Sequence, residues 1–413
     1  MRFIHAADIH LDSPCTGLPH LEGNLAQRLA GATREAFTAL VDEAVARRID
    51  LLLIAGDLFD GPWKDFSTGL FLVRQLGRLR EAGIPVCLVL GNHDAESPLI
   101  RDLPLPENVF CFDSAAPETR LLPATGAAVH GWSYPKRDVL DNPLGRFPGP
   151  HADLFNIGLL HTAAEGREGH APYAPCRLPD LKACGYDYWA LGHIHQRECL
   201  SDTPPIHFPG NLQGRNVREC GAKGFLLVET FPEDGGLDAR FQPIDLVRWE
   251  HLRLSVGQEK VLDDVEARLG TLLSELSSPL NLVRITFDDL SPNHVLRRLD
   301  PESLRMRCQA LAEACNAEIV IESVRLEQAA RVDISRSLPT GSMRQLLHTM
   351  QNRSGHPEFR SRLLERLAAL RKELPAPLAE ELFGGGEPSE SVLQEHIDTS
   401  LDHLLRQMSE EER

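Results

Sequence analysis

Residues 84–94 read IPVCLVLGNHD, a continuous apolar run that ends at a glycine followed by three polar residues. A run that is apolar throughout is typical of a strand covered on both faces. Residues 51–57 repeat the arrangement as LLLIAGD, and residues 71–82 between the two runs have the composition of a helix. Strands that alternate with helices predict a layered α/β domain, whose strand ends bring polar side chains to one edge of a sheet.

Five short polar motifs each follow directly on an apolar strand run. They are Asp8-Ile9-His10, Gly56-Asp57-Leu58-Phe59-Asp60, Gly91-Asn92-His93-Asp94, Leu160-His161 and Gly192-His193-Ile194-His195. Any one of them alone is typical of a turn or of polar surface residues. Five of them in order, all at the carboxyl ends of predicted strands, indicate a single ligand site, because such sites assemble at that edge.

Seven side chains in these motifs are candidate metal ligands. They are Asp8, His10, Asp57, Asn92, His161, His193 and His195. Oxygen and nitrogen donors without cysteine favour manganese, iron or another octahedral divalent ion over structural zinc. Seven donors suffice for two ions if one carboxylate bridges them, and two ions roughly 3.5–4 Å apart can bind a phosphate oxygen and activate water. The motifs therefore predict hydrolysis of a phosphoester.

The composition sets the class of protein. The chain has 413 residues, 42% of them hydrophobic and 25% charged, which predicts a folded core. No apolar run reaches the roughly 18 residues of a membrane span, and the opening residues MRFIHAADIH do not resemble a secretory signal. Nine cysteines without a CxxC pair indicate reduced thiols. We therefore expect a cytoplasmic protein that does not bind membranes.

The net charge of −17 is unevenly distributed. Residues 331–372 carry nine basic and three acidic side chains, whereas residues 373–413 carry two basic and eleven acidic ones. This asymmetry indicates either an interaction segment or two solvated helix faces. The bulk charge argues against tight DNA binding by the isolated chain, although two bound divalent ions would reverse the charge at the predicted site.

The order of the motifs, DxH, GDxxD, GNHD, H and GHxH, resembles that of the calcineurin-like metallophosphoesterases. Residues 208–215, FPGNLQGR, and 224–229, GFLLVE, resemble its DNA repair exonuclease branch, which includes SbcD-like and YhaO-like nuclease subunits. The resemblance implies an α/β fold, a layered αββα sandwich over residues 1–245. It also implies a small βαβαβ capping domain over 246–330 and a helical C-terminal segment over 331–413. We expect the helices of that segment at 343–350, 358–374 and 392–408.

The resemblance also implies a role for each site residue. The first metal would be held by Asp8, His10 and His195, the second by Asn92, His161 and His193, and Asp57 would bridge the two. His93, which is not a ligand in the family, would protonate the leaving oxygen or stabilise the phosphate. Asp94 would orient the His93 imidazole and tune its charge, and Asp60 would support the ligands without binding metal.

The predicted activity is a two-metal phosphodiesterase that cleaves the DNA backbone in DNA repair, as an exonuclease with or without endonuclease activity. Manganese is the expected metal, with iron, magnesium and zinc as alternatives. A small-molecule phosphodiesterase or phosphatase would use the same ligands and is the alternative, as is a non-catalytic scaffold. Asp60 is followed by Gly61-Pro62 in place of the Arg-Gly of phosphoprotein phosphatases, which counts against a phosphoprotein substrate. Arg215 and Arg218 are open to two interpretations, as DNA contacts or as solvated turn residues.

The resemblance further implies a coiled-coil SMC-like ATPase partner, bound through helices beyond the capping domain. The chain contains no P-loop sequence, so an ATP-driven step would need a separate protein. Leucines at helical spacing, including Leu363, Leu364 and Leu367, would contact this partner or pack on the chain's own capping domain. A homodimer is compatible with the sequence as well.

Overall fold

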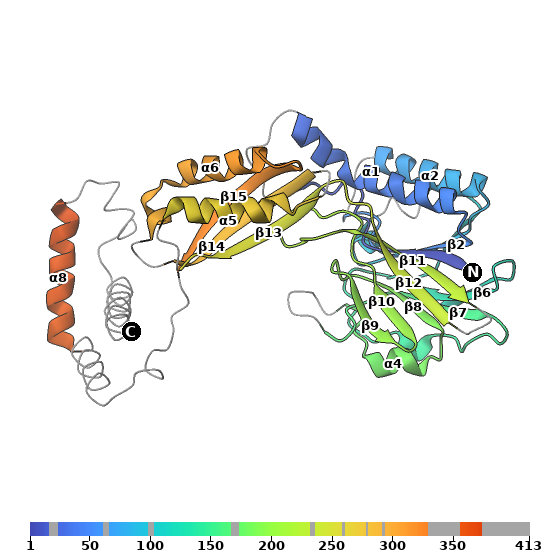
Figure 1. Ribbon diagram of the computed structural model, residues 1–413. Coiled ribbons are helices and arrows are strands. Elements are labelled where there is room, and N and C mark those ends of the chain that lie inside the picture. Colours follow the sequence, from blue (N-terminus) through green and yellow to red (C-terminus); the bar gives the residue numbers. More distant parts are fainter. Residues whose placement is uncertain are drawn as a thin grey trace. The chain divides into compact units, whose positions relative to one another are not determined.

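The computed structural model describes residues 1–15, 24–60, 66–97, 103–166, 173–231, 236–257, 261–277, 280–290, 294–328 and 356–373. The chain forms two compact units, which we describe separately (Figure 1). The first comprises residues 1–254, 262–286 and 299–325, and the second comprises 255–261, 287–298 and 326–413. The domain boundaries expected after residues 245 and 330 stay predictions.

The first sheet of the larger unit has the strand order β12-β11-β1-β2-β3-β4. Its strands are β1 (Arg2–Ala6), β2 (Leu51–Ala55), β3 (Val86–Val89), β4 (Val109–Cys111), β11 (Gly224–Phe231) and β12 (Gly236–Pro243). Strands β1 to β4 pair in parallel, and β11 joins β1 antiparallel. Helices α1 (Asn24–Arg47) and α2 (Phe66–Glu81) cover one face of this sheet, as the alternation of strands and helices predicts (Figure 1).

The second sheet has the order β5-β6-β7-β8-β10-β9. Its strands are β5 (Glu118–Leu122), β6 (Ala127–Trp132), β7 (Phe155–His161), β8 (Tyr188–Gly192), β9 (Glu198–Asp202) and β10 (Pro205–Phe208). The short helix α4 (Leu178–Ala183) packs on its outer face, where Leu181 lies in one apolar cluster with Trp189 and Leu191. Two single-turn helices lie in connecting loops: Asp94–Glu96 between β3 and β4 of the first sheet, and Leu144–Arg146 between β6 and β7.

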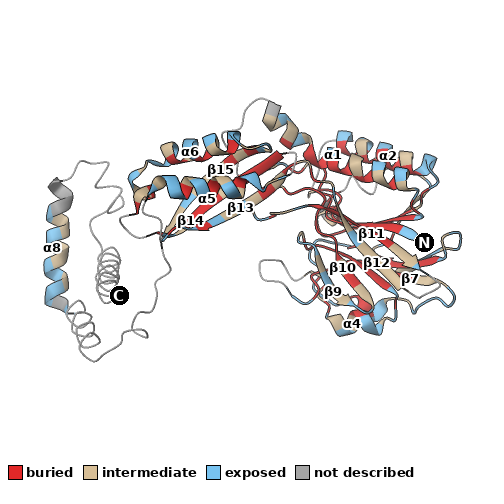
Figure 2. Ribbon diagram, in the orientation of Figure 1, coloured by how far each residue is buried: buried red, intermediate tan, exposed pale blue. Residues whose placement is uncertain are grey.

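The two sheets pack face to face around a buried core (Figure 2). Strand β2 explains the continuous apolar runs, since each of its five residues is buried. Leu51, Leu53 and Ala55 face the second sheet, whereas Leu52 and Ile54 pack among residues of α1 and α2. The predicted αββα sandwich is confirmed, because α1 and α2 cover the outer face of the first sheet and α4 packs on that of the second.

A third sheet has the order β13-β14-β15. Along the chain, helix α5 connects β13 to β14 and helix α6 connects β14 to β15, and the two helices contact each other. The elements are β13 (Arg248–Ser255), α5 (Leu262–Ser274), β14 (Leu280–Leu290), α6 (Pro301–Glu313) and β15 (Glu318–Gln328), with a single helical turn at Val295–Arg298. This is the predicted β-α-β-α-β order. Within the larger unit, Trp249, Leu280 and Leu282 pack with Leu29 and Ala32 of α1.

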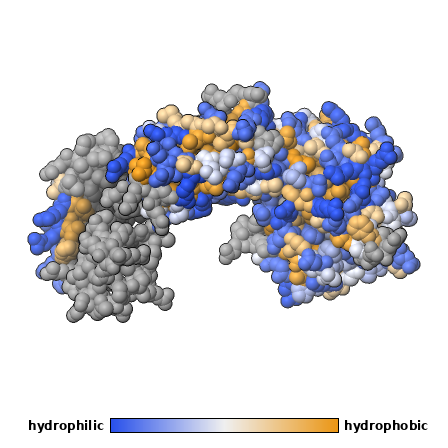
Figure 3. All heavy atoms as spheres, in the orientation of Figure 1, coloured by the Kyte–Doolittle hydropathy of each residue, from blue (hydrophilic) through white to orange (hydrophobic). Residues whose placement is uncertain are grey.

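The C-terminal segment contributes one described helix, α8 (Pro357–Glu373), where a helix over 358–374 is predicted. A stripe of apolar surface runs along α8 beside hydrophilic side chains (Figure 3). The helices predicted at 343–350 and 392–408 lie outside the described residues. Within the described ranges, no helix combines the length and the apolar content needed to cross a membrane.

Candidate metal centre

All seven predicted ligands lie where strands of the two facing sheets end. Asp8 and His10 follow β1, Asp57 follows β2, Asn92 follows β3, His161 ends β7, and His193 and His195 follow β8. Five parallel strands from two sheets thus direct their carboxyl ends to one place. The structure brings the seven side chains together there, as the motif positions predict.

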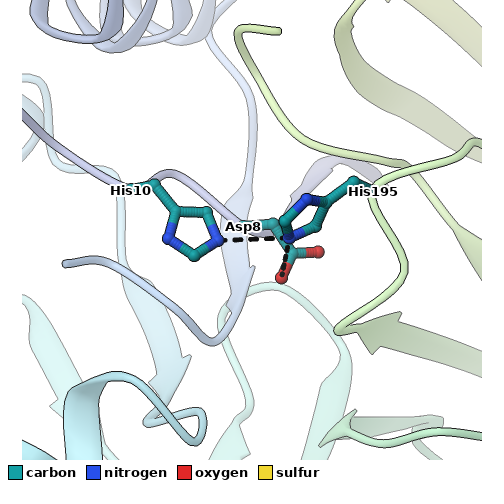
Figure 4. Close-up of side chains that lie close together, drawn as sticks. All are labelled: Asp8, His10 and His195. Atoms are coloured by element: carbon teal, nitrogen blue, oxygen red, sulfur yellow. Dashed lines mark hydrogen bonds and ion pairs between the residues drawn. The ribbon is translucent and has the colours of Figure 1, made fainter. Parts of the chain in front are cut away.

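The first group of ligand atoms belongs to Asp8, His10 and His195 (Figure 4). The Nε2 atoms of His10 and His195 lie 3.2 Å apart, and Nε2 of His195 lies 3.9 Å from Oδ1 of Asp8. One donor atom from each of the three residues lies within 4.8 Å of the others. That spacing allows a single ion to contact all three.

The second group is formed by Asp8, Asp57 and His161, again with ligand atoms within 4.8 Å of one another. Nε2 of His161 lies 3.4 Å from Oδ2 of Asp57 and 3.0 Å from Oδ1 of Asn92. The same Oδ2 of Asp57 is 3.8 Å from Nε2 of His10. One carboxylate oxygen therefore lies between a histidine of each group, where a bridging ligand would have to be.

His193 lies beside the second group and belongs to neither of the two groups of possible ligand atoms. Its imidazole lies against that of His161, with 5.1 Å between the ring centroids, and its backbone N–H donates to both carboxylate oxygens of Asp8. His193 also has a φ of 104°, and Asp8, His10 and Asp57 have φ values of 51°, 45° and 53°. Non-glycine residues held at positive φ cluster at functional sites, because only a firm surrounding structure maintains them.

The hydrogen bonds fix which nitrogen of two histidines is available to a metal. Nδ1 of His161 lies 2.9 Å from the carbonyl oxygen of Ala55, and Nδ1 of His195 lies 2.8 Å from Oε1 of Glu219. Carbonyl and carboxylate oxygens only accept, so both Nδ1 atoms carry the proton and both Nε2 atoms present a lone pair. Nη2 of Arg215 also lies 3.3 Å from Nδ1 of His195, but it is closer to Oε1 of Glu219, at 2.9 Å. The two Nε2 lone pairs face the oxygens of Asn92, Asp57 and Asp8. Imidazole and carboxylate acceptors that converge in this way fit a cation.

Burial also favours the protonation states of the histidines that bind metal. It lowers the pKa of His10 and of His161, so both imidazoles favour the neutral form that binds metal. Burial, together with the neighbouring Asp57, raises the pKa of Asp8 well above its usual range. A divalent ion would offset this crowding of carboxylates, since an opposite charge favours the ionised form.

Glycines precede the ligand positions because neighbouring side chains occupy the space of a Cβ atom. A Cβ on Gly91 would lie 2.2 Å from Oδ1 of Asp57, and one on Gly56 would lie 2.5 Å from Nδ1 of His161. Gly56 also has a φ of 90°. The glycines of the GD and GN motifs are therefore required by the close approach of the two loops.

His93 lies beside the ligands and is only half-buried. Its Nδ1 is 3.1 Å from Oδ1 of Asp60, and its ring meets that of His10 edge to face at 5.2 Å. Burial lowers the pKa of His93, but Asp60 and Asp57 outweigh this effect and raise it above the ordinary value. The hydrogen bond from His93 in turn lowers the pKa of Asp60 to about 2. His93 is thus a candidate proton donor held by a carboxylate.

The carboxylate that orients His93 is Asp60, so the predicted orienting contact from Asp94 is wrong, whereas the charge of Asp94 does help to raise the pKa of His93. Asp94 instead accepts backbone hydrogen bonds from Leu58 at 3.1 Å, Phe59 at 3.0 Å and Gly91 at 3.0 Å. It is fully buried, and burial with the nearby Asp57 raises its pKa to about 7. The Asp94 side chain points back into the turn, so it joins the loop after β2 to the loop after β3.

Sequence reasoning missed Glu219 and did not decide between two roles for Arg215. Burial would raise the pKa of Glu219, but the bonds from His195 and Arg215 outweigh it and lower that pKa below its usual range. Arg215 lies 2.9 Å from Glu219 and 3.5 Å from Asp60. The only signal in the sequence was an arginine and a glutamate four residues apart in a loop. Arg218 is exposed, and its backbone N–H bonds to Asn216.

The comparison with known proteins agrees with the geometry. Residues 1–197 match the calcineurin-like phosphoesterase family. The chain is 38% identical over 303 residues to the uncharacterized metallophosphoesterase YhaO of Bacillus subtilis, covering 72% of this chain and 74% of that protein. It is 29% identical over 276 residues to the DNA double-strand break repair protein Mre11 of Methanopyrus kandleri, covering 60% of this chain and 58% of that protein.

A solved structure, TT1561 of Thermus thermophilus, is also similar. The sequence identity is 14% and the TM-score is 0.36, over 58% of this chain and 98% of that one.

Proposed function

This chain belongs to the calcineurin-like phosphoesterase family, and we propose that it is a two-metal phosphodiesterase that hydrolyses the DNA backbone. Family membership implies a phosphoester hydrolase. The proposal rests on one observation. The acceptor atoms of His195, His161 and Asn92 lie close to the carboxylates of Asp8 and Asp57, so that all five residues direct acceptors to one place. Such a set of donors suits a pair of divalent ions.

The resemblance to the family implies how the ligands would divide between two metal positions. Asp8, His10 and His195 would hold one ion, Asn92, His161 and His193 would hold the other, and Asp57 would be shared. When bound, the two ions stabilise the charge on the phosphate and activate the attacking water. We expect manganese at both positions, since oxygen and imidazole ligands accept several divalent ions and availability decides.

Residues of the chain supply the proton for the leaving oxygen and hold the ligand loops in position. Asp60 holds Nδ1 of His93, which leaves Nε2 of His93 to protonate the departing sugar oxygen. Asp94 fixes the distance between the loops that carry Asp57 and Asn92, because it bonds to the backbone of both. The proton for the leaving oxygen and the spacing of the two loops are thus assigned to residues of the chain.

DNA is favoured over a small molecule by two observations. The relatives include a DNA double-strand break repair protein, and the chain carries a third sheet with two helices that a compact small-molecule hydrolase does not need. We expect exonuclease activity, with or without endonuclease activity, in a cytoplasmic DNA repair protein. A coiled-coil SMC-like ATPase would bind residues 331–413, and a homodimer is compatible with this arrangement.

The test separates DNA from small phosphoesters in one experiment. The purified chain with Mn²⁺ is incubated with end-labelled linear duplex DNA, closed circular DNA and a chromogenic phosphodiester. We expect release of nucleotides from the linear duplex, abolished by a chelator and by His161→Ala. His151→Ala, which changes an exposed histidine in the loop before β7, is the matched control and should retain activity. Turnover of the chromogenic ester with the DNA left intact would favour the small-molecule alternative.

A further inference from the structure

We propose that Arg215 and Glu219 are positioning residues that couple the metal ligand His195 to the non-ligand His93. The inference rests on the proposed metal chemistry but not on DNA as the substrate. It concerns a continuous series of contacts, His195 to Glu219 to Arg215 to Asp60 to His93.

Glu219 orients His195. Its Oε1 accepts from Nδ1 of His195 at 2.8 Å, and the glutamate side chain is only 8% exposed. Its Oε2 accepts from the backbone N–H of Arg215 at 2.8 Å and from Nδ2 of Asn211 at 3.0 Å. The carboxylate is therefore fixed by the loop backbone. A fixed acceptor at Nδ1 directs the Nε2 lone pair of His195 towards Asp8 and His10.

Arg215 links this carboxylate to Asp60. Its Nη2 lies 2.9 Å from Oε1 of Glu219, and its Nη1 lies 3.5 Å from Oδ2 of Asp60 and 3.2 Å from Oγ of Ser13. Ser13 donates to the same Oδ2 at 2.7 Å. Oδ1 of Asp60 remains for Nδ1 of His93 at 3.1 Å. One guanidinium thus fixes both carboxylates that orient the two histidines.

The geometry favours this role over contact with a substrate phosphate. The Arg215 side chain is 13% exposed, and its three nitrogens all have protein partners, with Nε 3.4 Å from Oε2 of Glu219. A planar guanidinium can span two carboxylates, whereas a lysine ammonium acts as a single point charge. The position therefore requires arginine for its shape as well as its charge.

The experiment measures metal binding and turnover separately. Protein stripped of metal is titrated with Mn²⁺, free Mn²⁺ is followed by electron paramagnetic resonance, and kcat and KM are measured on a chromogenic phosphodiester. The variants are Glu219→Gln, Asp60→Asn, Arg215→Gln and Arg215→Lys. The control is Arg284→Gln, which removes a 16% exposed arginine from its 2.7 Å ion pair with Glu322 in the third sheet.

Each variant has a distinct expected result. Glu219→Gln weakens Mn²⁺ binding at one of the two sites by about 10–100-fold. Asp60→Asn keeps both ions but lowers kcat by about 10-fold or more with little change in KM. Arg215→Gln shows both effects. Arg215→Lys shows smaller losses of Mn²⁺ binding and of kcat, because it keeps the charge but not the planar guanidinium that spans the two carboxylates. Arg284→Gln should lower thermal stability alone.

The proposal is overturned if Arg215→Gln binds two Mn²⁺ ions and turns over substrate within about twofold of Arg284→Gln. If Arg215→Gln does not fold, Arg215→Lys and Glu219→Gln decide, and wild-type Mn²⁺ affinity in both would overturn it. A chain that binds Mn²⁺ and cleaves the chromogenic ester but not DNA would contradict only the proposed substrate.

Discussion

The two halves of the candidate metal centre are held in place by different parts of the chain. His161 ends a central strand, is fully buried, and is oriented by the backbone carbonyl of Ala55 in the facing sheet. His195 lies in a loop, is half-buried, and is oriented by the side chain of Glu219. One half thus depends on the packing of two sheets, and the other on a hydrogen bond to one carboxylate that a single substitution can remove.

This difference has a consequence for how the site fails. A change on the His161 side disturbs the sandwich itself, since its neighbours belong to the core. A change on the His195 side leaves the sheets intact and alters only the orientation of the ligand. Four predictions test the comparison, in order of decreasing effect.

The largest effect is expected from His161→Ala. Removal of a ligand from the buried half should release one metal ion and lower phosphodiesterase activity on the order of 10³-fold or more. Elemental analysis and steady-state kinetics measure the two effects. Full activity of this variant in chelated buffer would contradict the assignment, and His151→Ala serves as the control.

A smaller effect is expected from His93→Ala, because His93 belongs to neither set of ligands. Both metal ions should stay bound while kcat falls on the order of 10²-fold or more, as for loss of a general acid. The measurement is metal content beside kcat. Loss of an ion from this variant would show that His93 is a ligand.

A third effect, on stability, is expected from Gly91→Ala. The new methyl group would lie 2.2 Å from Oδ1 of Asp57, so the surrounding atoms would have to shift. This shift should lower the free energy of unfolding by about 1–3 kcal/mol and weaken metal binding. Gly77→Ala is the control, because no atom lies within 4 Å of a Cβ at this position in α2. The control should gain about 0.5–1 kcal/mol. Equal stability of the two variants would refute the explanation.

The smallest effect concerns His5, which joins the two sheets beneath both halves. Its Nδ1 lies 3.0 Å from the Tyr188 hydroxyl and its Nε2 3.0 Å from the Leu191 carbonyl, and burial lowers its pKa to about 3. The folded state therefore favours neutral His5. Its contribution is complete above the unfolded pKa of about 6.5, and it is lost as the pH falls from there towards 3.

Between pH 7 and pH 5 the His5 contribution should fall by about 2 kcal/mol. Urea unfolding of the wild type and of His5→Gln at both pH values measures it. The variant cannot titrate at this position, so its stability should depend less on pH. An identical pH dependence of the two proteins would contradict the role of His5.

The candidate site shows how far the sequence alone could predict it. The candidate ligands could be found because each lies at the end of an apolar strand run, and the strand ends of each sheet meet at one edge. The partner of His93 could not be found in this way. Asp94 is adjacent in the sequence, but its side chain turns to the backbone of Leu58 and Phe59, and Asp60 reaches His93 from the loop after another strand.

The fold divides in the same manner. The sequence by itself determined the layers, the order of the elements and the candidate metal ligands, because periodicity and strand ends are local properties of the chain. Only the tertiary structure decided that Glu219, Arg215 and Asp60 join His195 to His93. These contacts connect loops that follow β2 and β10, and the distance between such loops depends on how the two sheets pack rather than on any local pattern.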